Sequence, residues 1–185
     1  MDRLEVITTH IDWFLERKDS VLVAIDGKCT SGKTTLSQKL AKHYDCNVMH
    51  MDDFFLRPEQ RTAERFSQVG GNVDYERFQA EVLTPLLSGN PFSYRPFDCK
   101  TFSLSEAIAV TPKKLNIIEG SYAMHPHFGD PYDLKILLTV DPETQRQRIG
   151  ERPAHLQERF LTQWIPMENQ YLEGFCISQK ADLIL

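Results

Sequence analysis

Apolar residues recur at helical spacing near the start of the chain, and the pattern then changes. Between residues 3 and 17 the apolar positions fall on one helical face, which predicts an amphipathic helix. Five short, mostly apolar runs follow, at residues 21–25, 47–51, 115–118, 134–140 and 181–185, and the first of them is continuous. Such runs are typical of strands that are buried on both faces of a parallel sheet.

Helical sequence separates most of these runs. The spacing of apolar positions predicts a helix that reaches about Tyr44, a second over 74–87, and helical sequence from 144 to about 175. Residues 88–112 are rich in proline, serine and phenylalanine and have no clear period. Strands that alternate with helices predict an α/β fold with a five-stranded parallel sheet, whose ligands bind at the carboxyl ends of the strands.

The first apolar run leads directly into residues 27–34, which form a complete G-x-x-x-x-G-K-[ST] motif. Its glycines let the backbone wrap closely around an anion, and successive N–H groups face the phosphates of a nucleotide. Lys33 reaches the β- and γ-phosphate oxygens, and the Thr34 hydroxyl ligates Mg²⁺. We therefore expect ATP and Mg²⁺ to bind here, at a site formed by Gly27, Lys28, Cys29, Thr30, Ser31, Gly32, Lys33, Thr34 and Thr35.

Carboxylates follow the second and third runs. Asp52 and Asp53 come after residues 47–51, and Glu119 closes the third run. Phosphoryl transfer to an alcohol uses a carboxylate that orients the hydroxyl and accepts its proton, next to Mg²⁺. Glu119 is expected to hold the Mg²⁺ shell, usually through water. Adjacent residues of a strand point to opposite faces, so only one member of the aspartate pair faces the site; solvated acids at a strand end are the alternative.

Three arginines follow the fourth run. Arg146, Arg148 and Arg152 lie within seven residues of each other, in sequence that we expect to be helical. Guanidinium groups stabilise the charge that develops on a transferring phosphoryl group, often from a lid that closes over the nucleotide. The alternative is an exposed helix face on which these arginines pair with glutamates three or four residues away.

Together these motifs resemble the uridine kinase family and its relatives, the nicotinamide riboside kinases, phosphoribulokinases and bacterial-type pantothenate kinases. The resemblance covers most of the chain: residues 27–34, Met51-Asp52-Asp53-Phe54-Phe55, Asn72-Val73-Asp74, Ile117-Ile118-Glu119-Gly120 and Lys180-Ala181-Asp182-Leu183-Ile184. Asp-Asp-Phe-Phe looks most like the nicotinamide riboside kinase version, whereas uridine kinases tend to have Asp-Ser-Phe-Tyr. The arginine spacing of the family is not reproduced cleanly.

The resemblance implies a P-loop NTPase fold, a three-layer sandwich with a helical lid, formed by a single kinase domain over residues 1–185. Residues 57–112 would then form the acceptor-site region, and residues 144–175 the lid and the helix after it. Asp52 is the implied base, with Lys33 and Arg148 acting on the phosphoryl group and Thr34, Asp52 and Glu119 near the metal. The implied acceptor-site residues are Asp52, Phe55, Asp74, Tyr94 and Arg152, and the resemblance implies that Phe54 and Phe55 together help to wall the acceptor site.

Two alternatives bear on this assignment. A helix N-cap accounts for Asp74 as well as a hydrogen bond to ribose hydroxyls does, and loop packing accounts equally for Tyr94.

The function that we expect is an ATP-dependent kinase of a small-molecule alcohol, with uridine or cytidine ranked first. Nicotinamide riboside and another sugar or vitamin alcohol are the alternatives. A P-loop ATPase switch is the competitor from another class, but the chain has neither an N-K-x-D tetrad nor an L-S-G-G-Q-like signature.

The amino-acid composition limits the classes of partner that we expect the protein to bind. The net charge of −5 argues against broad electrostatic attachment to nucleic acid or to an anionic membrane. No apolar stretch approaches the roughly 20 residues that span a bilayer. The four cysteines are scattered without a C-x-x-C pair, and the N-terminus lacks a secretory pattern. A cytoplasmic enzyme is the expectation, and the sequence does not predict its oligomeric state.

Overall fold

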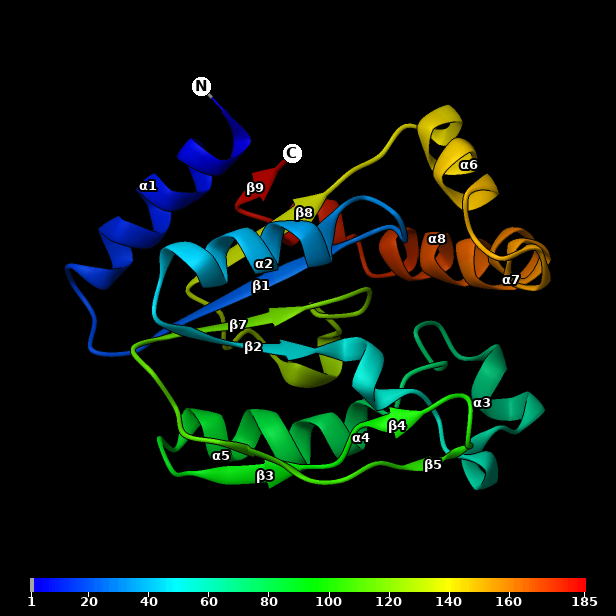
Figure 1. Cartoon of the computed structure of the whole chain (residues 1–185), viewed down its shortest axis with the longest axis horizontal. Coiled ribbons are helices and arrows are strands. Elements are labelled where there is room, and N and C mark those ends of the chain that lie inside the picture. The colour runs from blue at the N-terminus through cyan, green and yellow to red at the C-terminus, as the bar shows by residue number, and fades with distance from the viewer. Residues whose placement is uncertain (1) are drawn as a thin grey trace.

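The computed structural model describes residues 2–185. Its centre is a five-stranded sheet with the order β2-β7-β1-β8-β9, and every pairing is parallel (Figure 1). The strands are β1 (Val21–Gly27), β2 (Cys46–His50), β7 (Leu115–Glu119), β8 (Leu134–Leu138) and β9 (Leu183–Ile184). All five coincide with the five apolar runs, so the predicted parallel α/β fold is confirmed.

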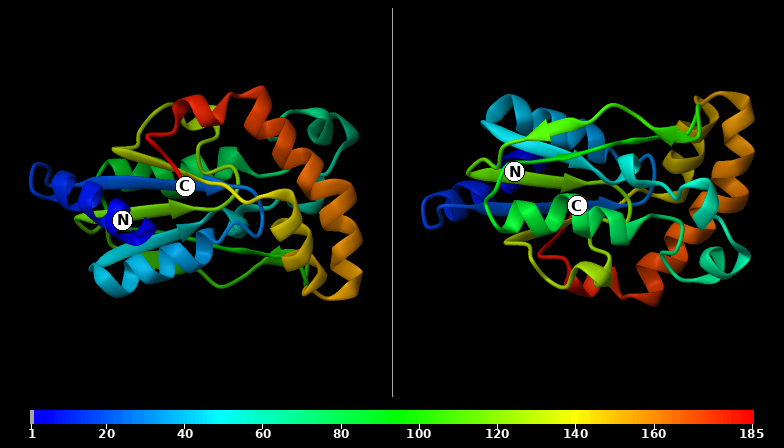
Figure 2. Two further views of the ribbon diagram at one scale, coloured as in Figure 1. Left: turned by 90° about the horizontal axis from the view of Figure 1, so that it is seen from above. Right: turned by 90° about the horizontal axis from the view of Figure 1, so that it is seen from below.

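Helices cover both faces of the sheet and bury alternate residues of its strands (Figure 2). On one face α1 (Arg3–Leu15) and α2 (Lys33–His43) pack through Ile7, Ile11 and Leu40 against Val23 and its neighbours. On the other face, β1 turns Leu22 and Ala24 toward a second core, which includes residues of segment 75–87 and of the C-terminal helices. The result is the three-layer sandwich that the motifs implied.

Residues 75–87 are helical, as the spacing predicts. The stretch consists of α4 (Tyr75–Phe78), a π-helical turn η3 (Gln79–Leu83) and α5 (Thr84–Leu87). Asp74 is the N-cap residue of α4, because its carboxylate accepts a hydrogen bond from the backbone N–H of Arg77 at 3.2 Å. The helix therefore begins one residue later than the predicted range.

Segments outside the sheet differ most from the expectation. Strand β2 ends at His50, and both aspartates lie in a 3₁₀ turn, η1 (Met51–Phe54), rather than at a strand end. Further short helical segments are η2 (Pro58–Gln60), α3 (Ala63–Ser67) and η4 (Pro126–Phe128). Residues 92–110 form two small antiparallel ladders, β3 (Phe92–Tyr94) with β6 (Ile108–Val110) and β4 (Phe97–Asp98) with β5 (Ser103–Leu104).

The arginine-rich helical sequence is not continuous. It forms α6 (Pro142–Gly150), α7 (Ala154–Arg159), a π-helical turn η5 (Phe160–Trp164), α8 (Ile165–Gly174) and α9 (Ile177–Lys180). The break falls at Pro153, which has no backbone N–H and disfavours helical geometry in the residue before it. Within residues 2–185, no helix is both long enough and apolar enough to cross a bilayer.

Candidate active site

The phosphate-binding loop connects β1 to α2, and its backbone conformation needs glycine. Gly27 has φ of 140°, and a Cβ atom there would lie 2.1 Å from the carbonyl oxygen of Leu138. Gly32, the N-cap of α2, has φ of 99°. Both angles lie in a region that L-residues with side chains rarely adopt. The two glycines therefore close the loop onto the N-terminus of α2, where free N–H groups attract an anion.

Lys33 lies at the mouth of this loop. Its ammonium donates hydrogen bonds to the carbonyl oxygens of Gly27 at 2.8 Å and Lys28 at 2.9 Å, and the residue is buried. These contacts hold the positive charge in one place before a ligand arrives. A charge that is fixed in advance costs little reorganisation when phosphate oxygens bind.

Asp26 fixes the base of the loop, and our sequence analysis did not single it out. The carboxylate is fully buried and accepts four hydrogen bonds, from the backbone N–H groups of Gly27, Tyr122 and Met124 and from the hydroxyl of Tyr171. Burial raises the pKa of this carboxyl group, and the hydrogen bonds oppose that rise. An acid inside an otherwise apolar run was the signal that could have revealed it.

Glu119 ends β7 beside the loop, as predicted. Its Oε1 accepts hydrogen bonds from the Thr34 hydroxyl at 3.3 Å and from Nδ1 of His50 at 2.5 Å, whereas its buried Oε2 has no hydrogen-bond partner in the described chain. The His50 pKa is raised, mainly by this hydrogen bond. An orphaned carboxylate oxygen next to a hydroxyl suits Mg²⁺, which prefers oxygen ligands.

The protein alone does not form a full metal cage. Within residues 2–185, no group of three or more histidine, cysteine, aspartate or glutamate side chains is arranged to hold a metal ion. This fits Mg²⁺, which is usually bound by one or two protein groups together with substrate phosphates and water. Thr34 and Glu119 are the residues that would hold it.

The two aspartates of η1 point into different surroundings. Asp52 is open to solvent on one side, but the protein around it removes enough water to raise the pKa of its carboxyl group, which the positive charge of Lys33 partly offsets. Asp53 instead accepts a hydrogen bond from the Tyr94 hydroxyl at 3.1 Å. Glu119 acts electrostatically on both aspartates, whereas Lys33 is a main influence on Asp52 alone, which favours Asp52 over Asp53 as the carboxylate next to the phosphates.

The predicted acceptor-site residues lie on the same side of the molecule but are engaged to different degrees. Asp74 is buried, and besides capping α4 its carboxylate pairs with Arg57 at 3.3 Å and with Arg77 at 3.5 Å. Phe55 is partly exposed and forms an isolated bridge with Val73. The diol-binding role of Asp74 stays a prediction, while its capping role is a structural fact.

Phe54 is a core residue and does not line an acceptor site. It is fully buried, and its ring packs edge-on against Phe78 at 5.0 Å and tilted against Tyr94 at 5.3 Å. The Arg77 guanidinium lies 4.2 Å from the same ring. The expectation that Phe54 and Phe55 together wall the acceptor is therefore wrong for Phe54, because the 3₁₀ turn directs its ring into the core.

Of the three lid arginines, Arg148 is the one placed against the loop. Its guanidinium donates a hydrogen bond to the carbonyl oxygen of Thr30 at 2.6 Å. Neither Arg146 nor Arg152 makes a side-chain hydrogen bond within the described part of the chain, and none of the three pairs with a glutamate there. The alternative of a salt-bridged helix face is thus not what α6 shows.

Comparison with known proteins agrees with this architecture. No family model matches the chain. It is 25% identical to a uridine kinase of Anoxybacillus flavithermus (strain DSM 21510 / WK1), over 91% of this chain and 87% of that protein. A uridine kinase of Latilactobacillus sakei subsp. sakei (strain 23K) is 23% identical, over 92% and 87%. Over most of its length the chain is therefore similar to proteins named uridine kinases.

Solved structures show the same fold. A possible uridine kinase from Bacillus stearothermophilus superposes with a TM-score of 0.71 at 20% identity, covering 97% of this chain and 98% of that one. A structure from Silicibacter sp. TM1040, described as a candidate kinase of a fructose transport system, also has a TM-score of 0.71, at 25% identity with full coverage of both chains. Both structures share the fold of this chain, and their descriptions name different kinases.

Helix α8 also contributes to the loop, through a residue that our sequence analysis did not single out. The buried Glu168 carboxylate accepts hydrogen bonds from the backbone N–H of Cys29 and from the Ser121 hydroxyl, both at 2.8 Å. Gln145 of α6 donates to the carbonyl oxygen of Cys29 at 3.1 Å. Burial and Glu168 raise the pKa of the Cys29 thiol to about 12, so this thiol stays protonated.

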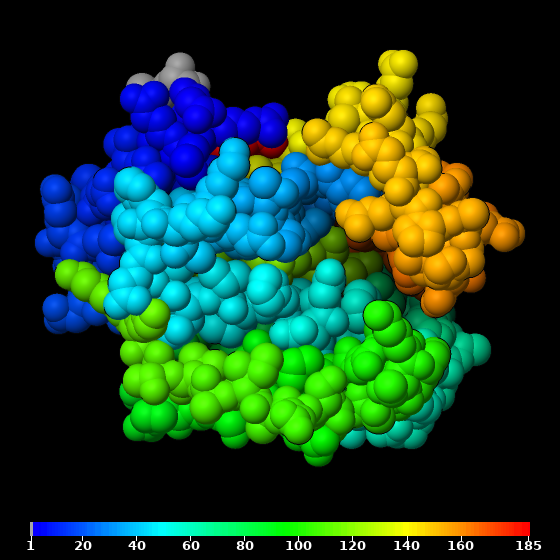
Figure 3. Space-filling model, viewed as in Figure 1, coloured from blue at the N-terminus to red at the C-terminus, as the bar shows by residue number. Residues whose placement is uncertain are grey.

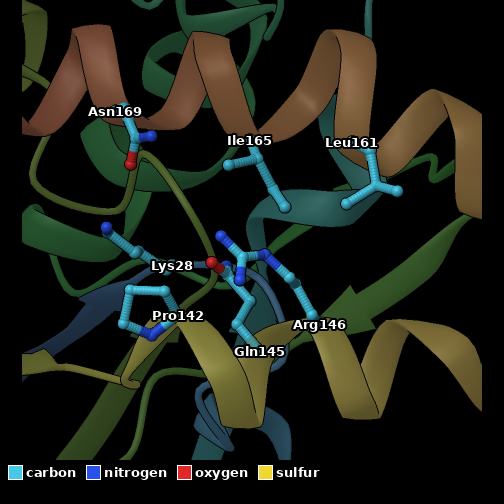
Figure 4. Close-up of a pocket in the computed structure, with 7 residues that line it drawn as sticks. All are labelled: Lys28, Pro142, Gln145, Arg146, Leu161, Ile165 and Asn169. Carbon is cyan, nitrogen blue, oxygen red and sulfur yellow. The ribbon is translucent and has the colours of Figure 1, made fainter.

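A cavity of about 280 Å³ opens behind the loop, between α6 and α8 (Figure 4). Its lining residues combine two cations, two amides and apolar side chains: Lys28, Pro142, Gln145, Arg146, Leu161, Ile165 and Asn169. Gln145 and Arg146 extend from α6 toward α8, whereas the ammonium of Lys28 points away from them (Figure 4).

Proposed function

We propose that this protein is a kinase, which transfers the γ-phosphoryl group of ATP to a hydroxyl of a small-molecule acceptor, with Mg²⁺ bound beside the loop. The observation that carries the proposal is the surroundings of Asp52. Its electrostatic neighbours include the loop lysine Lys33 and Glu119, whose Oε2 has no hydrogen-bond partner in the described chain, at the carboxyl edge of the sheet. A base, a phosphate-binding cation and a metal-holding acid at one edge are the parts that phosphoryl transfer to an alcohol uses.

The donor is positioned by the loop. Backbone N–H groups between Gly27 and Thr34 bind the phosphates, and the fixed ammonium of Lys33 binds the β- and γ-phosphate oxygens. Mg²⁺, held through Thr34 and Glu119, would neutralise charge on those oxygens. The guanidinium of Arg148, now on the carbonyl oxygen of Thr30, is near enough to the loop to turn toward the γ-phosphate when the lid closes.

Asp52 acts on the acceptor. Its carboxylate accepts the proton of the acceptor hydroxyl, whose oxygen forms a bond to the γ-phosphorus while the bond from that phosphorus to the β–γ bridging oxygen breaks and ADP leaves. The raised pKa of Asp52 makes it a better proton acceptor than an ordinary aspartate. Phe55 and Tyr94 border the acceptor in this arrangement, with Arg152 reaching it from the lid.

A nucleoside is the first acceptor to consider, with uridine or cytidine foremost, because two relatives at 23–25% identity are named uridine kinases. The contacts that the Asp74 carboxylate already makes favour a second candidate acceptor. This residue, proposed to bind the ribose hydroxyls, is already engaged by a helix cap and two arginines. Nicotinamide riboside, or another sugar or vitamin alcohol, is therefore the alternative acceptor.

An acceptor screen tests the proposal. Purified protein with ATP and Mg²⁺ is assayed for ADP release against nucleosides, sugars and vitamin alcohols. We expect ADP release to depend on one class of alcohol and to produce its phosphate ester. ADP release at the full rate without any alcohol would contradict a kinase and support the P-loop ATPase switch.

A further inference from the structure

The acceptor side of the molecule contains an arginine without an acidic partner. Arg61 donates from Nε to the carbonyl oxygen of Leu56 at 2.9 Å. Its guanidinium lies over the rings of Phe102 at 4.9 Å and Phe97 at 5.7 Å, in a cation–π arrangement that fixes its plane. In residues 2–185, no carboxylate pairs with it, and the remaining N–H groups of its planar fork make no hydrogen bond.

The neighbouring arginines behave differently. Arg57 pairs with Glu59 and Asp74, Arg65 with Glu76, and Arg77 with Glu81 and Asp74. These pairs have N–O distances between 2.6 and 3.5 Å. Arg61 and Arg95 have no acidic partner in residues 2–185, but Arg95 donates to the carbonyl oxygens of Leu104 and Ser105 through two of its nitrogens, whereas Arg61 makes a single hydrogen bond. Acidic residues of this region pair with Arg57, Arg65 and Arg77, but none of them pairs with Arg61.

Arg61 stands close to Asp52. Strand β4, which carries Phe97, packs against the turn η1 that carries the aspartate. Cys99 follows β4, and the pKa of its thiol is raised by burial and by Asp52 and lowered by Arg61 and by Arg159 of α7. The same thiol also senses the carboxylate of Asp98, so charges of both signs surround it.

Arg159 adds a second unpaired cation from the lid. It is the last residue of α7, its guanidinium lies 4.9 Å from the Trp164 ring, and no carboxylate pairs with it in the described chain. Figure 1 shows α7 and the β4–β5 ladder at the same end of the molecule, toward which β2 and β7 point. The space-filling view shows the surface hollowed between the lid and this ladder (Figure 3).

We infer that the acceptor is an anionic alcohol, whose phosphate or carboxylate group is bound by Arg61 and Arg159 while its hydroxyl faces Asp52. A planar guanidinium matches either anion through two parallel hydrogen bonds, and stacking on aromatic rings orients it for that contact. A neutral acceptor would leave two like charges in one cleft without a partner. The inference rests on the proposed function and narrows its acceptor.

Matched acceptors test the charge directly. Wild-type protein with ATP and Mg²⁺ is assayed with two pairs, glycerol with glycerate and ribose with ribose 5-phosphate, and with uridine as a neutral nucleoside. In each pair the anionic member has one free hydroxyl fewer, because a carboxylate replaces it or a phosphate esterifies it, and keeps the others. We expect the anionic member of one pair to have the higher kcat/KM. Preference for glycerate identifies a carboxylate site, and preference for ribose 5-phosphate identifies a phosphate site.

Two variants then assign the residues. Arg61→Gln and Arg159→Gln should each raise KM for the preferred anionic alcohol roughly ten- to a hundredfold, as expected for loss of a charge-assisted hydrogen bond. The KM for ATP and kcat should change little. Arg17→Gln, at the end of α1 and far from the cleft, is the matched control. A rise in the KM for ATP in Arg159→Gln would assign that arginine to the nucleotide and overturn its part in the inference.

A binding measurement separates the inference from the proposed function. Inorganic phosphate is titrated into protein saturated with Mg²⁺ and a non-hydrolysable ATP analogue, so that the loop is already filled. We expect binding that Arg61→Gln abolishes and Arg17→Gln retains. Absence of phosphate binding, or a uridine preference over every anionic alcohol, overturns the inference while a working kinase leaves the proposed function in place. Full ADP release without an acceptor overturns the proposed function instead.

Discussion

The donor and acceptor halves of this site are built in opposite ways. Around the phosphate-binding loop, charged side chains already have partners: Asp26 accepts four hydrogen bonds, and Lys33 donates to two loop carbonyl oxygens. On the acceptor side, Arg61 and Arg159 have no acidic partner in residues 2–185, and the ladders around them have strands of two or three residues. The ionic groups Asp26 and Lys33 of the donor half are thus held before any ligand binds, apart from the orphaned Oε2 of Glu119, whereas two guanidinium groups of the acceptor half have no acidic partner in the described chain.

This difference follows from what each half recognises. The triphosphate is common to all P-loop kinases, so a buried and fully hydrogen-bonded cradle serves it without adjustment, and low dielectric strengthens each contact. An acceptor differs from enzyme to enzyme, and loops on a rigid scaffold vary most easily. Substitutions in the donor half should therefore abolish turnover with any acceptor, whereas those in the acceptor half should change which acceptor is used.

Removing the loop ammonium tests the donor half most severely. Lys33→Ala should reduce ATP turnover to background with every acceptor. Loss of one hydrogen-bond donor to the transition state costs roughly 10²- to 10³-fold. The loss here should be larger, because Lys33 also binds the nucleotide in the ground state. Lys39→Ala, on the exposed side of the same helix, is the control. ADP release measures turnover, and thermal unfolding checks the fold. Near-normal turnover in Lys33→Ala would remove the basis for a prebuilt donor half.

Asp52 lies at the border of the two halves, and its substitution should have the next largest effect on turnover. Asp52→Asn should lower kcat by roughly 10²- to 10⁴-fold, the range for loss of a general base, while nucleotide affinity changes much less. Asp53→Asn is the matched comparison, since its carboxylate binds the Tyr94 hydroxyl instead. If Asp53→Asn has the large effect and Asp52→Asn the small one, the roles within the pair are reversed.

The pH dependence of kcat gives a second test of the assignment of Asp52 as the base. Only the ionised carboxylate accepts a proton, so kcat should be constant above the pKa of Asp52 and fall as pH drops through it. Because the surrounding protein raises that pKa, the fall should begin at a higher pH than for an ordinary aspartate. The acidic limb should be missing in Asp52→Asn, and its persistence there would assign it to another group.

Substitution of Glu168 should have a smaller effect, and it should strengthen the binding of ATP rather than weaken it. Glu168→Gln keeps an oxygen for the N–H of Cys29 and an amide that can donate to the Ser121 hydroxyl, but removes a negative charge from beside the phosphates. We expect ATP to bind roughly two- to tenfold more tightly, since like charges at short range repel. Glu173→Gln, exposed on the same helix, is the control. Weaker ATP binding in Glu168→Gln would mean that the carboxylate supports the loop more than it repels the nucleotide.

The two halves also differ in how far they can be predicted from sequence. The strands and the loop were predictable because their signals are local: mostly apolar runs and an eight-residue motif. The approach of Asp52 to Glu119 followed from the rule that carboxyl ends of parallel strands share an edge. By contrast, Glu168 reaches Cys29 across 139 residues, and no local pattern reports such a contact.

The acceptor side escaped prediction for another reason. The β4–β5 ladder is two residues long on each strand, too short for an alternating pattern, and Arg95 holds it by donating to the carbonyl oxygens of Leu104 and Ser105. The unpaired state of Arg61 is also invisible in sequence, because the acids that could have paired with it are near in the chain but turn elsewhere. Short irregular segments are determined by such tertiary contacts more than by propensity.

The last and smallest effect concerns Asp74, which either belongs to the acceptor site or only supports it. Asp74→Asn keeps a capping oxygen for α4, since asparagine caps as well as aspartate, but weakens the pairing with Arg57 and Arg77. If the carboxylate binds a ribose diol, the substitution should reduce the preference for a ribonucleoside over its 2′-deoxy analogue, because a site built around a hydroxyl rejects the analogue that lacks it. If Asp74 has only a structural role, the weakened pairing with Arg57 and Arg77 should cost about 1 kcal/mol of stability, and the substitution should leave that preference unchanged. The ratio of kcat/KM for the two nucleosides, measured beside the unfolding temperature, decides between the two roles, and an unchanged ratio would assign acceptor recognition to the unpaired arginines.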